Sequence, residues 1–266
     1  MAGQGQSEHT EEKQYGLGKV LSQWLSIVDR IVAKWKVTYP VLYVDMNAGS
    51  GWNKEVNCIG SPLLFLSESD KHAFKKEIYF IESNVNSLME LGESIKARNP
   101  KDIDSCNLIN GNHSEILPDI IKRRSGLGLI YHDPNGLPSF DLIREIYQHP
   151  SAAKVDILIR ISGTNYKRIR NGVDSLGKKK QISDLIGKYP NLKDQLKSIN
   201  KKQWIVRDII DPDPYQWTFL LGTNFVDFKA WESQGFYKIE SSKGAAILNR
   251  ISYTVKELGD YGNGSL

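Results

Sequence analysis

Five short apolar segments alternate with helix-like segments between residues 41 and 161, and this alternation restricts the possible folds strongly. The expected strands are Val41 to Asp45, Glu77 to Glu82, Cys106 to Asn110, Leu127 to His132 and Val155 to Ile161. The expected helices between them are Ser61 to about His72, Asn84 to Arg98, Ser114 to Arg124 and Phe140 to His149. Strands that alternate with helices require right-handed crossovers. The pattern therefore predicts an α/β fold with a doubly wound, mostly parallel sheet.

The segments on either side of this region complete the expected domain. Residues 1–16 are mostly polar and are expected to form a disordered tail, and apolar spacing predicts a helix over Leu17 to Lys36. Beyond Lys202, strands are expected over 217–222 and 245–255, with a short helix over 226–233. The two strands would form an antiparallel C-terminal edge. We expect one domain over residues 17–266, with a basic insertion at about 161–207.

Positive charge is concentrated in that insertion. Ile161 to Lys202 holds eleven Lys or Arg against three Asp, a balance of +8, whereas the rest of the chain has a balance of −4. Such a segment is typical of a surface that binds a polyanion, although a solvated helical face is an equal alternative. The residues expected to bind nucleic-acid phosphates are Lys167, Arg168, Arg170, Lys178, Lys179 and Lys180.

The rest of the composition is that of an ordinary globular protein. Hydrophobic residues make up 40% and charged residues 25% of the chain. No run approaches about eighteen apolar residues, so no membrane span is expected. The two cysteines, Cys58 and Cys106, lack metal-ligand spacing, and no metal site is expected. A reducing, cytoplasmic compartment is the simplest interpretation.

A glycine-containing loop follows the first expected strand. Tyr43 to Gly51 reads Y-V-D-M-N-A-G-S-G, so the strand ends in Asp45 and passes into a G-x-G turn. Gly49 and Gly51 lack Cβ and can adopt positive φ, so a ligand can approach the backbone closely. In open α/β sheets, ligands bind at the carboxyl ends of the strands. The alternative is an ordinary turn between a strand and a loop.

Polar residues also follow the other expected strands. Glu82 ends the second strand, where a carboxylate can accept from both hydroxyls of a ribose. Asn112 follows the third, where a side-chain carbonyl can accept from an adenine amine. The fourth is followed by Asp133-Pro134-Asn135-Gly136, a turn whose acid, amide and carbonyl groups can hold a substrate. A surface acid and plain turns are the alternatives at these positions.

The chain resembles the class I S-adenosylmethionine-dependent methyltransferases, whose fold is Rossmann-like, in the order of four motifs. They are Y-V-D-M-N-A-G-S-G, then Gly60-Ser61-Pro62-Leu63, then F-I-E ending in Glu82, then Asp133-Pro134-Asn135-Gly136. More narrowly, the chain is similar to the three-Cys-motif partner proteins, and its early part also to the 23S ribosomal RNA adenine methyltransferases. The resemblance covers roughly residues 39–161 and is weaker elsewhere. It implies that S-adenosylmethionine is the cofactor. The cofactor-binding residues that it implies are Asp45, Asn47, Ala48, Gly49, Gly51, Glu82 and Asn112.

The sequence departs from this pattern at the end of the fourth strand. Methyltransferases that act on base amines usually carry (Asp/Asn)-Pro-Pro-aromatic there, but Asn135-Gly136 replaces the second proline and the aromatic residue. Tyr131, His132 or a later aromatic residue would have to supply the stacking ring. Stacking planes from Trp204, Tyr215 and Trp217 are a further hypothesis, with core packing as the alternative, which is favoured for Trp217.

The resulting hypothesis is a methyltransferase that acts on nucleic acid, with an adenine exocyclic amine as target. Asp133, Pro134 and Asn135 are the expected catalytic residues. The alternative is a methyltransferase-like binding module that serves a partner protein without catalysis of its own. A nucleotide-binding dehydrogenase is disfavoured, because the loop is not a G-x-G-x-x-G that opens directly into a helix.

Overall fold

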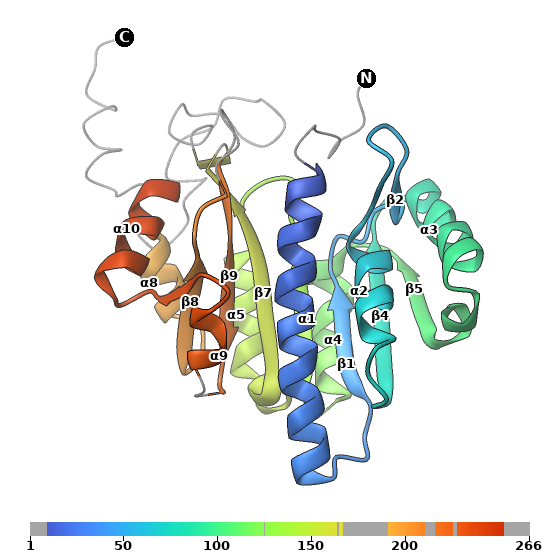
Figure 1. Cartoon of the computed structure of the whole chain (residues 1–266), viewed down its shortest axis with the longest axis horizontal. Coiled ribbons are helices and arrows are strands. Elements are labelled where there is room, and N and C mark those ends of the chain that lie inside the picture. Colours follow the sequence, from blue (N-terminus) through green and yellow to red (C-terminus); the bar gives the residue numbers. More distant parts are fainter. Residues whose placement is uncertain are drawn as a thin grey trace. The chain divides into compact units, whose positions relative to one another are not determined.

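The structure is a computed structural model that describes residues 10–124, 126–163, 165–166, 191–210, 216–225 and 228–252 (Figure 1). The chain divides into two compact units. The first consists of Met1–His132 and His149–Asp156, and the second of Asp133–Gln148 and Ile157–Leu266. The expectation of one domain with a basic insertion at about 161–207 stays a prediction, because much of that insertion lies outside the described residues.

Four parallel strands lie in the first unit: β1 (Val41–Asp45), β4 (Lys76–Glu82), β5 (Cys106–Asn110) and β6 (Gly128–His132). Their order is β6-β1-β4-β5, so β1 pairs with β4 on one side and with β6 on the other. Every residue of β1 and β6 is buried, as is typical of parallel strands covered on both faces. The predicted bounds of all four strands agree with the observed ones to within one residue.

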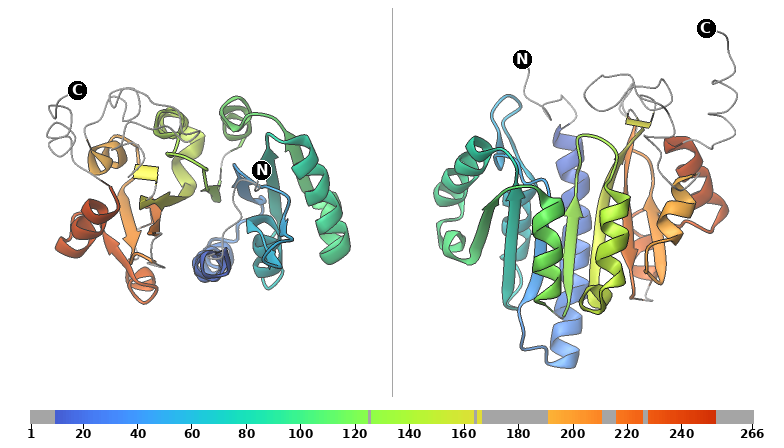
Figure 2. Two further views of the ribbon diagram at one scale, coloured as in Figure 1. Left: turned by 90° about the horizontal axis from the view of Figure 1, so that it is seen from above. Right: turned by 180° about the vertical axis from the view of Figure 1, so that it is seen from behind.

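Helices cover both faces of these strands. They are α1 (Thr10–Trp35), α2 (Ser61–Ser69), α3 (Val85–Arg98) and α4 (His113–Lys122), with the 3-10 helices η1 (Pro100–Ser105) and η2 (Pro150–Lys154). Helices α1 and α2 lie side by side on one face, and α4 lies on the other, as the view from behind in Figure 2 also shows. This arrangement confirms that the parallel strands are doubly wound.

The core of the first unit is built around the ring of Tyr43 on β1. This ring stacks on Phe65 of α2 with centroids 3.5 Å apart, and it meets the edge of Phe80 on β4 at 6.3 Å. Burial raises the pKa of Tyr43 well above its ordinary value, with a smaller contribution from the charge of Asp45. A buried hydrogen bond of 3.0 Å from Trp24 Nε1 to Asp156 Oδ2 ties α1 to the end of this unit.

The strands of the second unit are antiparallel. They are the greater part of β7 (Val155–Ser162), β8 (Gln203–Arg207), β9 (Trp217–Thr223) and β10 (Phe236–Lys238), in the order β10-β8-β9-β7. The helices of this unit are α5 (Phe140–Gln148), α8 (Leu192–Lys197), α9 (Lys229–Glu232) and α10 (Ser242–Ile251). Parallel strands followed by antiparallel strands confirm the expected α/β class.

The strand expected over residues 245–255 is wrong. Residues 242–251 form helix α10, in which Gly244, Ile247, Leu248 and Ile251 are buried at helical spacing. The side chain of Ser241 caps the helix by accepting from the N–H of Gly244 at 3.1 Å. The sequence pattern favours a strand here because the apolar run is too short to show the period of 3.6 residues. The antiparallel partners of β9 are instead β7 and β8.

Three short strands were not predicted either. The hairpin β2 (Trp52–Asn53) and β3 (Cys58–Ile59) has two residues in each strand, and β10 has three. Segments this short carry no alternation that a sequence pattern can reveal. The hairpin is instead held by a tertiary contact, in which the guanidinium of Arg98 lies 3.5 Å above the ring centroid of Trp52.

Helix α1 starts earlier than predicted. It begins at Thr10, so residues 10–16, which were expected to be part of a disordered tail, are helical. Gln14 and Gly16 are buried, and this packing extends the helix beyond its apolar stripe. Residues 1–9 lie outside the described part of the chain. None of the helices in the described part is both long and apolar enough to cross a membrane.

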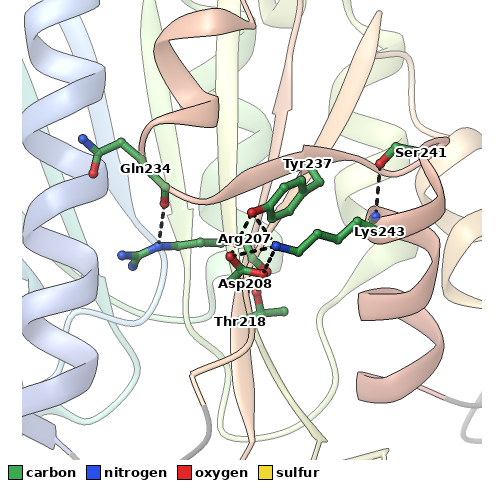
Figure 3. A network of polar contacts seen from close by, with 8 residues as sticks. Arg207, Asp208, Thr218, Gln234, Tyr237, Ser241 and Lys243 are labelled. Carbon is green, nitrogen blue, oxygen red and sulfur yellow. Dashed lines mark hydrogen bonds and ion pairs between the residues drawn. The ribbon is translucent and has the colours of Figure 1, made fainter.

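A polar network joins β8, β10 and α10 in the second unit (Figure 3). The hydroxyl of Tyr237 donates to Asp208 Oδ2 at 3.0 Å, and Lys243 Nζ lies 2.6 Å from the same hydroxyl and 3.2 Å from Asp208 Oδ1. Beside it, Thr218 donates to the carbonyl of Arg207 at 2.6 Å. These bonds fix the register of strands that are individually too short to specify it.

Packing at Gly244 generates a test of this arrangement. A Cβ at this position would lie 2.1 Å from the backbone oxygen of Lys238, so α10 could not dock unchanged. We expect Gly244→Ala to destabilise the protein by about 1–3 kcal/mol in urea unfolding. Gly18→Ala is the matched control, because its nearest neighbour atom lies at 3.5 Å in the interior of α1. It should stabilise by about 0.5–1 kcal/mol. Equal unfolding midpoints for Gly244→Ala and the wild type would contradict the packing.

Candidate cofactor site at the carboxyl ends of the parallel strands

The loop after β1 is pinned to both neighbouring strands. Asp45 is fully buried, and its Oδ1 accepts from the N–H of Asn47 at 3.0 Å, which turns the chain sharply. The N–H of Met46 then donates to a carbonyl of β6, and that of Ala48 to a carbonyl of β4, both at 3.0 Å. The loop is therefore a rigid extension of the sheet.

The two glycines of this loop have different surroundings. Gly49 has a φ of +63°, and a Cβ placed there would meet no atom within 4 Å. Gly51 has a φ of +73°, but its Cβ would lie 2.5 Å from Leu91 of α3, and its carbonyl accepts from the N–H of Gly60 at 2.7 Å. Gly49 thus borders open space, whereas Gly51 packs against α3 within the protein, and its positive φ favours glycine. Gly60 is the N-cap residue of α2, which begins at Ser61 as predicted.

The structure brings Glu82 against this loop. Its Oε2 accepts from the N–H of Gly49 at 2.9 Å, and its Oε1 accepts from the N–H of Asn84 at 2.8 Å. The backbone carbonyl of Glu82 accepts from Asn110 Nδ2 at 2.9 Å, which fixes the end of β5 beside the end of β4. One carboxylate therefore shapes the glycine loop and the turn into α3.

Asn112 lies where β5 leads into α4. Its side-chain oxygen accepts from the N–H of Ser114 at 3.0 Å, so it is the N-cap of α4. Gly111, with a φ of +155°, donates its N–H to the carbonyl of Glu82 at 3.1 Å. The cap and this turn hold Asn112 on the same edge of the strands as Glu82, with its side chain largely exposed.

Two histidines extend the polar lining of this edge. His132 is fully buried at the end of β6, and its Nδ1 lies 2.8 Å from Asn47 Oδ1. His113, the first residue of α4, meets the ring of His132 edge-on with centroids 5.5 Å apart. Burial lowers the pKa of His113, and the charge of Glu82 opposes this shift. Sequence reasoning missed His113, although its position directly after Asn112 was the available signal.

The stacking ring expected from Tyr131 or His132 is not available in this structure. Both side chains are 0% exposed, so neither presents a face to a ligand. Trp204 and Trp217 are buried as well. Core packing, rather than stacking on a base, is therefore confirmed for Trp217 and is also observed for Trp204. Tyr215 lies outside the described residues.

The expected catalytic turn begins the second unit, directly after His132 in the chain. The carboxylate of Asp133 forms an ion pair with the guanidinium of Arg160 on β7, through Oδ1 and Nε. Their side chains are 12% and 17% exposed, so the pair is largely shielded from water. Pro134 is buried and Asn135 is exposed. Sequence reasoning did not anticipate Arg160, because a lone arginine in an apolar strand gives no pattern.

The expected nucleic-acid-binding residues lie outside the part of the chain that the structure describes. They are Lys167, Arg168, Arg170, Lys178, Lys179 and Lys180. Their role stays a prediction from sequence charge alone.

No model of a known protein family matches the sequence, and no curated protein matches it either. The resemblance to three-Cys-motif partner proteins therefore stays a prediction. The fold is similar to that of WbdD, at 11% identity and a TM-score of 0.50, over 78% of this chain and 39% of the length of WbdD. It is also similar to protein LPL1258 from Legionella pneumophila, at 11% identity and a TM-score of 0.50, over 88% and 94% of the two chains.

A methyltransferase from Geobacter sulfurreducens also matches, at 13% identity and a TM-score of 0.42, over 77% and 76% of the two chains. The likeness to WbdD and LPL1258, at a TM-score of 0.50 and 11% identity, concerns the fold alone.

The lowered pKa of His113 predicts a pH dependence of stability. Because burial disfavours the charged imidazole, the unfolded chain binds more protons than the folded protein once the pH falls below the ordinary value of 6.5. The stability contributed by neutral His113 is thus present above that pH and is lost as the pH falls toward the lowered pKa. We expect the wild type to lose more stability than His113→Gln between about pH 7.5 and 5.5, measured by urea unfolding. Parallel pH profiles for the two proteins would refute the assignment.

Proposed function

We propose that this chain is an S-adenosylmethionine-dependent methyltransferase that acts on nucleic acid, with an exocyclic amine of adenine as its target. The observation that carries the proposal is the loop between Asp45 and Gly51. It is pinned to the strands on either side, it borders open space at Gly49, and it rests against the carboxylate of Glu82. The order of motifs in the sequence supports the same assignment through its resemblance to the class I methyltransferases.

The residues at this edge fit a nucleoside ligand. Oε1 of Glu82 accepts from the N–H of Asn84 and, at 3.4 Å, from the hydroxyl of Ser83. Oε2 accepts from the N–H of Gly49, and its second acceptor position is suited to a ribose hydroxyl. The Asn112 carbonyl oxygen likewise has a second lone pair for an adenine amine besides its capping bond. Gly49 allows close approach to the backbone, while Asp45, Asn47 and Ala48 fix the shape of the loop beside the methionine portion.

In the proposed reaction the protein acts mainly by positioning. When bound, S-adenosylmethionine supplies a methyl group activated by its sulfonium. Asp133 and the carbonyl of Pro134 accept hydrogen bonds from the target amine, which orients its nitrogen lone pair for in-line attack. Asn135, exposed in the same turn, adds a polar contact to the base.

The basic segment is the proposed phosphate-binding surface. The balance of +8 over residues 161–202 suits a polyanion, and binding that depends on it should weaken steeply with salt. A target base in a duplex would have to flip out of the stack to reach Asp133. We propose the cytoplasm as the compartment, in keeping with two cysteines that are not paired with each other.

A second candidate function is a binding module that serves a partner protein without catalysis. The ion pair between Asp133 and Arg160 favours it, because that pair occupies part of the carboxylate expected to receive the amine. The absence of a proline-aromatic pair after Pro134 favours it too. Calorimetric titration with S-adenosylmethionine, followed by assays of methyl transfer to DNA and RNA, separates the two. A module that binds the cofactor but methylates neither nucleic acid would support the second candidate.

Cofactor binding is tested at Gly49. Gly49→Val places a branched side chain in the open space and strains a φ of +63°. We expect it to weaken binding of S-adenosylmethionine by about 100-fold or more in calorimetry, whereas Gly49→Ala, with the same backbone strain but one carbon, should lose much less. Circular dichroism checks that both variants fold. Unchanged affinity in a folded Gly49→Val would rule out cofactor binding at this loop.

Catalysis is tested at Asp133. Asp133→Ala removes the proposed acceptor for the amine and should abolish methyl transfer, while the dissociation constant for S-adenosylmethionine stays within about threefold. Methyl transfer is measured with radiolabelled cofactor, and affinity by calorimetry. Methylation at the wild-type rate would show that Asp133 does not receive the amine.

A further inference from the structure

The turn that carries Asp133 has little rigidity of its own. It reads Asp133-Pro134-Asn135-Gly136, so a single proline restricts it before an Asn-Gly pair that is favourable in many turns. Proline fixes φ and so lowers the number of conformations that a loop can adopt. A second proline directly after Pro134 would restrict the turn further. Here that position is Asn135, and the turn needs another source of order.

The end of β7 supplies two tethers to this turn. Arg160, within β7, pairs with the carboxylate of Asp133 at the start of the turn. Asn165, three residues beyond β7, donates from Nδ2 to the carbonyl of Gly136 at 2.7 Å. The two bonds hold opposite ends of the same four residues, and both donors belong to the same stretch of chain.

The backbone that carries Arg160 is itself fixed. Arg160 is in antiparallel register with Phe219 of β9, and its neighbours Ile159 and Ile161 are buried. A planar guanidinium on a fixed strand presents its donors in one orientation, and a largely shielded charged pair is stronger than one exposed to water. The position of the Asp133 carboxylate is therefore imposed by β7.

We propose that Arg160 and Asn165 are positioning residues for the reacting turn, and that their tethers take the place of a second proline. This inference rests on the proposed function, in which Asp133 receives the target amine. Arg160 orients the Asp133 carboxylate through the ion pair, and Asn165 holds the far end of the turn through Gly136. Neither residue contacts the amine in this proposal.

Steady-state kinetics distinguishes positioning from a merely structural role. We expect Arg160→Gln to lower kcat about 100-fold, with KM for the nucleic acid and the dissociation constant for S-adenosylmethionine within about threefold of the wild type. Arg160→Lys should recover part of the loss, because lysine keeps the charge but not the planar fork. Asn165→Ala should lower kcat by a smaller factor than Arg160→Gln.

Arg144→Gln is the matched control. Arg144 lies in the same unit, is 15% exposed in its side chain, pairs with Asp141 and donates to Ser198 at 2.8 Å. Its loss removes a guanidinium of similar burial whose carboxylate partner, Asp141, is 85% exposed. A fall in stability is therefore expected while kcat stays near the wild-type value. Wild-type kcat in Arg160→Gln, or an equal fall of kcat in Arg144→Gln, would overturn the positioning role.

A double-mutant cycle separates this inference from the proposed function. If Asp133 and Arg160 are coupled, the urea midpoint of the double variant Asp133→Asn/Arg160→Gln will differ from the sum of the two single shifts. This readout requires no methyl transfer. Additive shifts would show that the tether is absent, which overturns the inference whatever the activity. The opposite combination is also informative. If the shifts are coupled but the wild-type protein neither binds S-adenosylmethionine nor methylates nucleic acid, the proposed function is refuted and the tether is retained.

Discussion

The structure of the first unit depends on the burial of β1 between two parallel neighbours. All five residues of β1 are buried, and its carboxyl end delivers Asp45 to the edge where β4 and β6 also end. The polar groups that follow cannot be left without partners in such a place. The loop after Asp45 satisfies them by donating to carbonyls of both neighbours, and this need fixes its shape. The geometry of the candidate site therefore follows from the way in which the buried strand β1 ends.

Much of the fold could be predicted because parallel strands have a simple signature. Segments such as β1 and β6 are apolar at nearly every position, and burial on both faces requires that pattern. The antiparallel part was harder. Helix α10 and strand β10 are short, and their identity is decided by tertiary contacts: Gly244 against the backbone of Lys238, and Tyr237 in the network with Asp208. Such contacts join residues whose proximity no local pattern encodes.

The candidate site shows the same division. Asp45, Gly49 and Glu82 could be singled out because strand ends and glycines are visible in a sequence. That Gly49 and Glu82 bond to each other across 33 positions, or that Arg160 pairs with Asp133, depends on strand order, which the sequence indicates only in outline. The different surroundings of Gly49 and Gly51 could not be predicted either, because the side chain that packs against Gly51 is Leu91, which lies on another element.

The bond between Gly49 and Glu82 changes how variants at Glu82 should be understood. Removing this carboxylate would take away a proposed partner for a sugar, and it would also release the backbone of the glycine loop and the first turn of α3. A measured loss of affinity at this position would therefore combine two effects of separate origin. Glutamine keeps an oxygen for one of the amides, whereas alanine keeps none. The difference between these two replacements would report how much of the loss belongs to loop order rather than to ligand contact.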